Sequence, residues 1–337
     1  MPKTTPETTP RITKLLLIFS TLVCPLFYGA SSFANSDSEA IKRAVESSLN
    51  CSNFVRYDKE NIYLGFGSYK RKFEEPRQPI PATLQVTSII NPAVNFKIAT
   101  ADAAIDSLRD GKSLFILTYS GIEEWDLLQK SRVAIYPTTP FRGTLAYLQH
   151  AQSFARFGDK AIIAHGRLGV SIFNLKTKQV EKEIHLLQRQ LPLESTAVGV
   201  TVQGKYAYIA MDNFSLVEKG HPAFRGLVVI DMTREAVVGE LDGMDPGADA
   251  VVSDGKKLIV SFGGIPIWKY ALNSFRGSQL PEPENRVWRF PLKGHPTGIP
   301  SMDDKYYYTC FYQAPAKPGE PYKKLPLALD RRVLMLD

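Results

Sequence analysis

The sequence predicts an all-β fold, a β-propeller of about six four-stranded blades (six or seven), from three observations. The 337-residue chain has globular composition, with 44% hydrophobic and 22% charged residues. A turn, a lysine and a β-rich run recur six times, at spacings of 53, 48, 45, 51 and 49 residues. Several short strands in each period of 40–50 residues are typical of propellers. The aligned lysines are Lys59, Lys112, Lys160, Lys205, Lys256 and Lys305.

Residues 1–34 are predicted to be a cleaved signal peptide. A short basic region precedes the almost wholly apolar run 15–30, and Ser32 and Ala34 place small residues at the −3 and −1 positions of a cleavage site. An uncleaved membrane anchor is the alternative, but Pro25 interrupts the run and a span needs about 20 residues. We therefore expect cleavage after Ala34, a periplasmic or secreted protein, and no transmembrane segment after cleavage.

Cleavage would remove Cys24 and leave Cys51 and Cys310, an even number in an oxidising compartment. We predict a disulfide between these two, with unpaired buried thiols as the alternative. The bond would close a loop of about 260 residues and contribute about 4–5 kcal/mol in the chain-entropy model. A lipid anchor on Cys24 is disfavoured because Val23 precedes it. No metal site is predicted, because no Cys or His spacing supports one.

The segment 35–52 is predicted to form a short helix against the propeller. Its apolar residues recur at a spacing of three to four, which places them on one face. Asp37 or Ser38 is the expected cap. The apolar residues are Ala40, Ile41, Ala44, Val45 and Leu49.

Residues 53–337 are predicted to form the propeller. The third repeat gives four strands, within 150–159, 160–166, 169–175 and 179–186. Asp-Gly or an equivalent pair joins the first strand to the second, as a tight hairpin requires. The second and third strands are almost continuously apolar, as expected of strands packed between neighbouring blades.

An aspartate or asparagine ends the third strand of several repeats. Its side chain is expected to form hydrogen bonds with backbone groups of the turn that follows. Placing the last such residue at Asp337 leaves the final blade incomplete or closed by an N-terminal segment. The predicted disulfide would then join the first repeat to the last. The residues at this position are Asp126, Asn174, Asp231 and Asp337.

The stretch GKYAYIAMDN at 204–213, followed by RGLVVIDMTREAVVGEL at 225–241, resembles bacterial YVTN/LVIVD-type, quinoprotein-dehydrogenase-like β-propellers. The resemblance spans about 53–337. The matching motifs are structural, and the family holds binding, scaffold and enzymatic members. The resemblance therefore implies the fold without naming a function.

Long connections between second and third strands are candidate recognition loops, at 68–82, 212–225 and 312–331. Such loops on a rigid scaffold often carry recognition, although variable surface decoration is the alternative. The third loop contributes three candidate binding residues, Tyr322, Lys323 and Lys324.

The connections between blades supply a second candidate set. His150 and His295 stand ten residues before their aligned lysines, and three carboxylates lie near equivalent positions. Imidazoles and carboxylates can act as acid and base or bind a metal, but opposite sides of a ring are too far apart to share one ion. Bonding of loop backbone is the alternative. The candidates are Asp102, His150, Asp245, Asp249 and His295.

No catalytic residue, cofactor or metal is assigned from the sequence. The GxSxG, HExxH, Walker and EF-hand patterns do not occur. Glu123 and Glu124 would be forced choices as metal ligands. Lys and Arg are scattered, with a net charge of +7, and an exported protein has little access to nucleic acid.

We therefore prefer an exported binding module or scaffold that recognises a protein, peptide or envelope polymer through its long-loop face. A channel-mouth hydrolase or oxidoreductase is the alternative. A rigid hub of an envelope complex is the third hypothesis.

Overall fold

The computed structural model describes residues 35–47, 52–67, 82–138, 151–166, 169–186, 196–212, 226–241, 248–253, 257–262, 265–271, 286–290, 294–313 and 323–330. These all belong to one compact unit, Ser32–Asp337. The predicted signal peptide lies outside the described residues and stays a prediction. Within the described ranges, no helix has the length and apolarity needed to cross a membrane.

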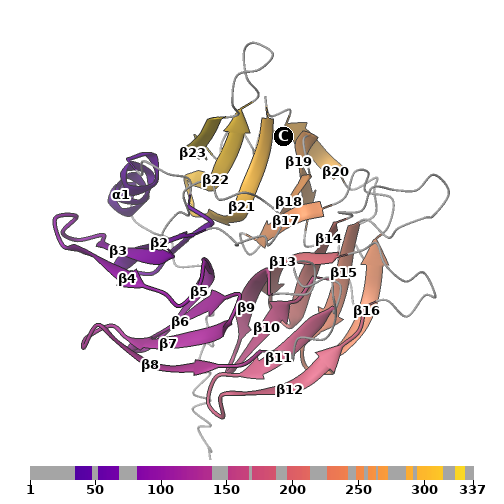
Figure 1. The fold of residues 1–337 in the computed structure, drawn as a ribbon. Coiled ribbons are helices and arrows are strands. Elements are labelled where there is room, and N and C mark those ends of the chain that lie inside the picture. The colour runs from indigo at the N-terminus through magenta and orange to yellow at the C-terminus, as the bar shows by residue number, and fades with distance from the viewer. Residues whose placement is uncertain are drawn as a thin grey trace, which may run out of the picture. The chain divides into compact units, whose positions relative to one another are not determined.

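The described chain contains one helix, α1 (Asn35–Glu46), and strands β1 to β23, so the predicted all-β class is confirmed (Figure 1). The strands fall into six consecutive repeats. Repeat 1 holds β1 (Phe54–Tyr57), β2 (Asn61–Phe66), β3 (Thr83–Ser88) and β4 (Asn95–Ala99). Repeat 2 holds β5 (Ala104–Asp110), β6 (Ser113–Thr118), β7 (Gly121–Asp126) and β8 (Ser131–Tyr136). Repeat 3 holds β9 (Ser153–Phe157), β10 (Lys160–Ala164), β11 (Val170–Asn174) and β12 (Gln179–Ile184).

Repeat 4 holds β13 (Thr196–Gln203), β14 (Tyr206–Asp212), β15 (Gly226–Asp231) and β16 (Ala236–Leu241). Repeat 5 holds β17 (Ala248–Ser253), β18 (Lys257–Phe262), β19 (Ile265–Ala271) and β20 (Arg286–Phe290). Repeat 6 holds β21 (Gly294–Met302), β22 (Tyr306–Gln313) and β23 (Lys323–Asp330). The strands predicted for the third repeat are confirmed.

Each of repeats 1 to 5 is an antiparallel arrangement of four consecutive strands, and repeat 6 has three within the described ranges. Repeats 6 and 1 share one seven-stranded sheet because β21 pairs with β1 in parallel, through Phe54 and Ile299. The Ile299 amide donates to the Asn53 carbonyl at 2.8 Å beside this pair. The first strand of each repeat also contacts the first strand of the next. The contacts run from β1 to β5, from β5 to β9, and onward through β13 and β17 to β21.

Five of the six aligned lysines, Lys59, Lys112, Lys160, Lys205 and Lys305, lie at the reversal between first and second strands, as predicted, and Lys256 lies outside the described residues. In repeats 2, 3 and 4 these hairpins place Gly111, Gly158 and Gly204 at φ of 57°, 58° and 58°. That left-handed conformation is disfavoured for residues with a Cβ atom. In these three repeats a glycine therefore permits the tight reversal that brings the first two strands together.

Clusters of buried apolar side chains fill the spaces between neighbouring repeats. On β10, Ala161 and Ile163 face repeat 2, whereas Ile162 and Ala164 face repeat 4. Alternate side chains of a strand point to opposite sides, so both faces must be apolar. Equivalent clusters join repeats 1 and 2, 4 and 5, and 5 and 6.

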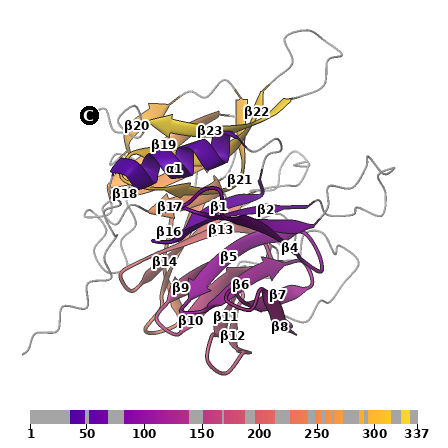
Figure 2. The same cartoon turned by 90° about the vertical axis from the view of Figure 1, so that its left-hand side faces the viewer.

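Helix α1 belongs to the cluster between repeats 6 and 1. Its buried Ala40, Ile41 and Val45 share this cluster with apolar side chains of β1, β2 and β22, and the helix also contacts β23 (Figure 2). The helix begins at Asn35, so both predicted caps, Asp37 and Ser38, lie inside it and the prediction is wrong. Asp37 instead lies in the first turn, where a carboxylate favours the positive end of the helix.

The polar residue at the end of the third strand bonds the following turn, as predicted. Asp126 accepts from the amides of residues 128 and 129, Asn174 from those of residues 176 and 177, and Asp231 from those of residues 233 and 234. These three expectations are confirmed.

The assignment of Asp337 to that position is wrong. The third strand of repeat 6 is β23, and Asp330 stands opposite Tyr306 just as Asp231 stands opposite Tyr206. Pro326 makes this stretch look unlike a strand, but an edge position tolerates proline. The predicted loop 312–331 therefore shrinks to the interval between β22 and β23.

Candidate functional site

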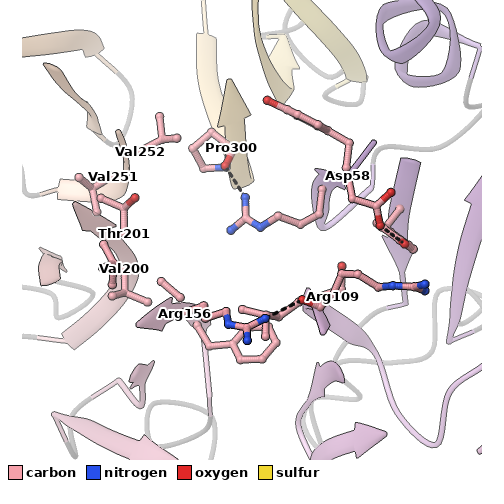
Figure 3. A pocket seen from close by; sticks show the side chains of 16 residues that line it. Asp58, Arg109, Arg156, Val200, Thr201, Val251, Val252 and Pro300 are labelled. Carbon is pink, nitrogen blue, oxygen red and sulfur yellow. Dashed lines mark hydrogen bonds between the residues drawn. The ribbon is translucent and has the colours of Figure 1, made fainter. Parts of the chain in front are cut away.

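A cavity of about 400 Å³ lies among the first strands of the six repeats (Figure 3). Its lining comes from β1, β5, β9, β13, β17 and β21, with Asp58 from the hairpin that follows β1 and Tyr63 of β2. The lining residues lie near the ends of the first strands that lead into the lysine-bearing hairpins. Second-to-third-strand connections leave from the other ends of the repeats.

Three arginines occupy the same strand position in consecutive repeats. Arg56, Arg109 and Arg156 are each the second-last paired residue of their first strand, opposite Tyr63, Leu114 and Ala161. The same position holds Val202 in repeat 4 and Val252 in repeat 5. The cavity therefore has an arginine wall and, opposite it, a valine wall that Val200 and Val251 extend.

Arg56 ties four first strands together. Its Nε lies 2.9 Å from Asp106 Oδ1, its Nη2 donates to Oδ2 at 3.1 Å, and its Nη1 donates to the Pro300 carbonyl at 2.8 Å. Asp106 is fully buried and also accepts from the Phe154 amide at 3.1 Å. Burial raises the pKa of Asp106, and the neighbouring Arg56 opposes that rise. Removing Arg56 would leave a buried carboxylate without its counter-charge.

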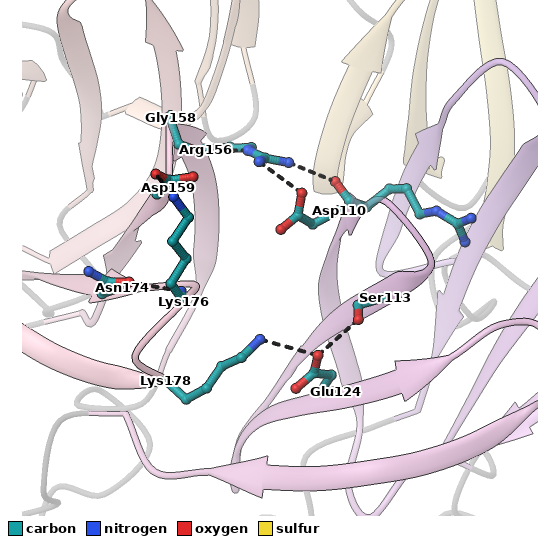
Figure 4. Close-up of polar contacts among 10 residues, drawn as sticks. Asp110, Ser113, Glu124, Arg156, Gly158, Asp159, Asn174, Lys176 and Lys178 are labelled. Atoms are coloured by element: carbon teal, nitrogen blue, oxygen red, sulfur yellow. Dashed lines mark hydrogen bonds and ion pairs between the residues drawn. The ribbon is translucent and has the colours of Figure 1, made fainter.

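Arg156 joins repeats 3 and 2 (Figure 4). Its Nη2 lies 2.9 Å from Asp110 Oδ1, its Nη1 donates to the Arg109 carbonyl at 3.2 Å, and its Nε donates to the Gly158 carbonyl at 2.7 Å. The Arg109 guanidinium points away from the valine wall (Figure 3), and its Nη1 is buried without a hydrogen-bond partner among the described residues. Ser107, 4% exposed, lines the same cavity, and its Oγ likewise has no partner within the described ranges.

Asp58 completes the polar wall. Its carboxylate accepts from the Tyr63 hydroxyl at 2.6 Å and from the amides of Glu60 and Asn61. Burial, followed by the bond to Asp58, raises the pKa of Tyr63 far above its ordinary value, so this phenol stays protonated at neutral pH. No imidazole or thiol appears in the described lining.

Asp102 is the predicted site residue whose side chain the structure describes. It lies between β4 and β5, where its carboxylate accepts from the Ala103 amide at 2.7 Å and from Ser120 Oγ at 3.4 Å. His150, Asp245 and Tyr322 lie outside the described residues.

Four other predicted site residues are on strands and not in connections. Asp249 belongs to β17, His295 to β21 opposite Tyr312, and Lys323 and Lys324 open β23. The prediction that these residues lie in connections is wrong. For His295, Lys323 and Lys324 the reason is that β21 and β23 begin earlier than the prolines near them suggest. No described contact brings these residues together.

Glu123 and Glu124 are structural within the described part of the chain. Glu123 accepts from the Ala101 amide and the Trp125 indole, and Glu124 from Ser113, Tyr136 and Lys178. No group of metal-binding side chains occurs in the described ranges. Cys310 is disulfide-bonded, while Cys51 lies outside those ranges, so the Cys51–Cys310 pairing stays a prediction.

Sequence reasoning missed the arginine wall, although a signal was present. Arg56 and Arg109 precede their aligned lysines by three residues and Arg156 by four. Aligning the ends of the first strands would have shown an arginine recurring in the first three repeats.

Comparison with known proteins adds little. No protein-family model and no curated protein matches the chain. Among solved structures, the computationally designed Ika8 protein is similar, with a TM-score of 0.47 and 9% identity over 84% of this chain and 98% of that chain. This similarity is too low to carry an argument about function.

Proposed function

We propose that the chain is a six-repeat β-propeller that works as a binding module, with a small ligand held in the cavity among its first strands. The propeller is supported by the contacts that run from each first strand to the next, and by the pairing of β21 with β1. The apolar clusters between neighbouring repeats support it further.

The observation that carries the binding role is the two-sided lining of the cavity. Ligand sites are concave, mostly apolar, and about 300–1,000 Å³ in volume, with a few polar groups that fix orientation. The cavity of about 400 Å³ fits this description, with valines on one side and arginines on the other. Its walls are strands, so the site is largely formed before the ligand arrives.

A binding role fits the lining better than catalysis. General acid–base chemistry needs a group that titrates near the working pH. Tyr63 is held protonated, and the carboxylates of Asp58, Asp106 and Asp110 are engaged by hydrogen bonds or ion pairs. We therefore propose no reaction for this cavity.

Export and recognition of a protein or envelope polymer through the long-loop face stay predictions. The loops concerned lie mostly outside the described residues. The cavity lies near the opposite ends of the first strands, so the two sites would be independent.

A ligand screen with a cavity-filling variant tests the proposed function. Organic acids, sugars, nucleotides, amino acids and short peptides are screened by thermal shift. A ligand at one hundred times its Kd should stabilise the fold by about 2.7 kcal/mol. We expect the stabilising compound to lose its effect on Val202→Trp, which fills the cavity.

Val133→Trp, the same change at an exposed site on β8, is the matched control and should bind normally. Compounds that stabilise both variants equally, or a screen in which nothing binds, would contradict the proposed function.

A further inference from the structure

We infer that the cavity ligand is a small organic carboxylate, with its anionic group toward Arg56 and Arg156 and an apolar body against the valine wall. This inference rests on the proposed function and adds the chemical class of the ligand.

The first step concerns the donors that remain on the two arginines. A guanidinium carries five N–H donors. Arg156 uses one on each of the Gly158 carbonyl, the Arg109 carbonyl and Asp110, so two remain. Arg56 uses three in good bonds to Asp106 and the Pro300 carbonyl, and a fourth in a 3.4 Å contact with the Val55 carbonyl. Donors are therefore left on both groups that border the cavity.

The second step concerns unmet hydrogen-bonding capacity at the same site. The Ser107 hydroxyl lines the cavity, is buried, and has no partner among the described residues. A buried hydroxyl without a partner is unfavourable by about 1–3 kcal/mol. A ligand oxygen in the cavity would accept from it and remove that penalty.

The third step concerns charge. The lining holds three arginines and one carboxylate, Asp58, whose oxygens already accept from Tyr63, Glu60 and Asn61. Asp106 and Asp110, which lie outside the lining, pair with Arg56 and Arg156. The lining therefore offers spare N–H donors, rather than a surplus of positive charge, and has little unused acceptor capacity. Planar guanidinium groups suit a carboxylate in particular, because its two oxygens match the fork of N–H groups.

The fourth step concerns the rest of the ligand. Val200, Val202, Val251 and Val252 line the cavity from repeats 4 and 5, and Figure 3 shows Val200, Val251 and Val252 on the opposite side of the cavity from Asp58. Val200 and Val251 are already buried in the clusters between repeats, whereas Val202 and Val252 pack against such clusters and are half-buried. A ligand with a short hydrocarbon body would cover the apolar surface that these two still expose, at about 25 cal/mol for each Å².

Hexanoate, hexanamide and hexyl phosphate are the probes, and isothermal titration at low salt is the measurement. Hexanoate and hexanamide share a five-carbon alkyl chain, hexyl phosphate has a six-carbon chain, and the three differ in the head group. We expect hexanoate to bind at least tenfold more tightly than hexanamide. Arg156→Gln should weaken hexanoate at least tenfold and leave hexanamide unchanged. Arg156→Lys, which keeps the charge without the planar fork, should weaken hexanoate by a smaller factor.

Arg234→Gln, at an exposed hairpin between β15 and β16, is the matched control and should bind as the unmodified protein does. Circular dichroism checks that each variant is folded.

Three results would overturn the inference while leaving the proposed function in place, provided that Val202→Trp still abolishes binding. The first is equal affinity for hexanamide and hexanoate. The second is tighter binding of hexyl phosphate than of hexanoate. The third is an affinity for hexanoate that Arg156→Gln does not change. Failure of all three probes to bind at millimolar concentration, when other screened compounds do bind in the cavity, would also overturn it. If nothing at all binds there, the proposed function itself fails.

Discussion

The residue at the end of each third strand has two roles when it is an aspartate. In repeat 4, Asp231 bonds the turn and also accepts from Lys205 at 2.9 Å. In repeat 3 the residue is Asn174, which bonds the turn in the same way, and Lys160 instead pairs with Glu181 and Glu235 at 2.8 and 2.6 Å. The chain thus contains a natural comparison between a charged and a neutral side chain.

Substitutions of Asp231 should separate these two roles. Asp231→Ala loses the turn bonds and the lysine, and we expect a loss of about 2 kcal/mol in unfolding free energy. Asp231→Asn keeps the turn bonds, as Asn174 does, and should lose less than half as much. Urea denaturation at pH 7 measures both, and equal losses would contradict the separation.

The difference in unfolding free energy between the unmodified protein and Asp231→Asn should depend on pH with a definite sign. Bonds from Thr233, followed by the bond from Lys205, hold the pKa of Asp231 well below its ordinary value of 3.8. The ionised form is favoured in the fold, so its stabilisation is fully present above about pH 4 and is lost as the pH falls further. The advantage of the unmodified protein over Asp231→Asn should therefore shrink between pH 5 and pH 2. A constant difference would exclude this role of the charge.

At the scale of elements, both apolar and polar contacts hold α1 against repeats 1 and 6. Ile41 is fully buried, Glu39 pairs with Lys305 and accepts from the Tyr306 hydroxyl at 2.8 Å, and the Tyr308 hydroxyl donates to the Ser38 carbonyl. Two of these partners, Tyr306 and Tyr308, lie on β22, and their rings belong to the same apolar cluster as the helix. The helix therefore stabilises the junction between repeats 6 and 1.

Ile41→Ala should destabilise the protein by about 3 kcal/mol, because it leaves a cavity between the helix and the strands. Thermal unfolding followed by circular dichroism measures the loss. Arg43→Ala, on the exposed side of the same helix, should change stability by less than about 0.5 kcal/mol. Equal effects of the two changes would mean that α1 does not stabilise the fold.

Elements with a strong local signal were predictable from the sequence. Strands such as β10 and β11 are apolar on both faces, and the hairpin glycines mark their starts. Strand β23 was missed because Pro326 argues against a strand unless the strand lies at an edge, and edges are decided by the fold. The arginine wall was missed because a side chain's position in a cavity depends on neighbouring repeats that are about 50 residues away.

At the scale of the whole molecule, the disulfide of Cys310 bears on the junction between the first and last repeats. Cys310 stands opposite Thr297 of β21, the strand that pairs with β1, and Cys51 lies three residues before β1 begins. The sequence positions therefore agree with the predicted bond across this junction.

Peptide mapping without reduction should recover a peptide that links Cys51 to Cys310. Cys51→Ser and Cys310→Ser should each lower stability by about 4–5 kcal/mol at most, and the double substitution should cost no more than either alone. A linked peptide that contains Cys24 would contradict both the pairing and the predicted cleavage after Ala34.

The pairing of β1 with β21 also bears on how the chain folds. Arg56 and Pro300, which bond across this junction, are 244 residues apart in the sequence, whereas every repeat is built from hairpins of neighbouring strands. Closing so long a loop is entropically unfavourable until the intervening repeats have ordered. The edge of β1 must then wait unpaired while later repeats are synthesised, and an uncovered edge is a template for aggregation. Helix α1 contacts mainly β22 and β23, so it can complete this junction only after repeat 6 has formed.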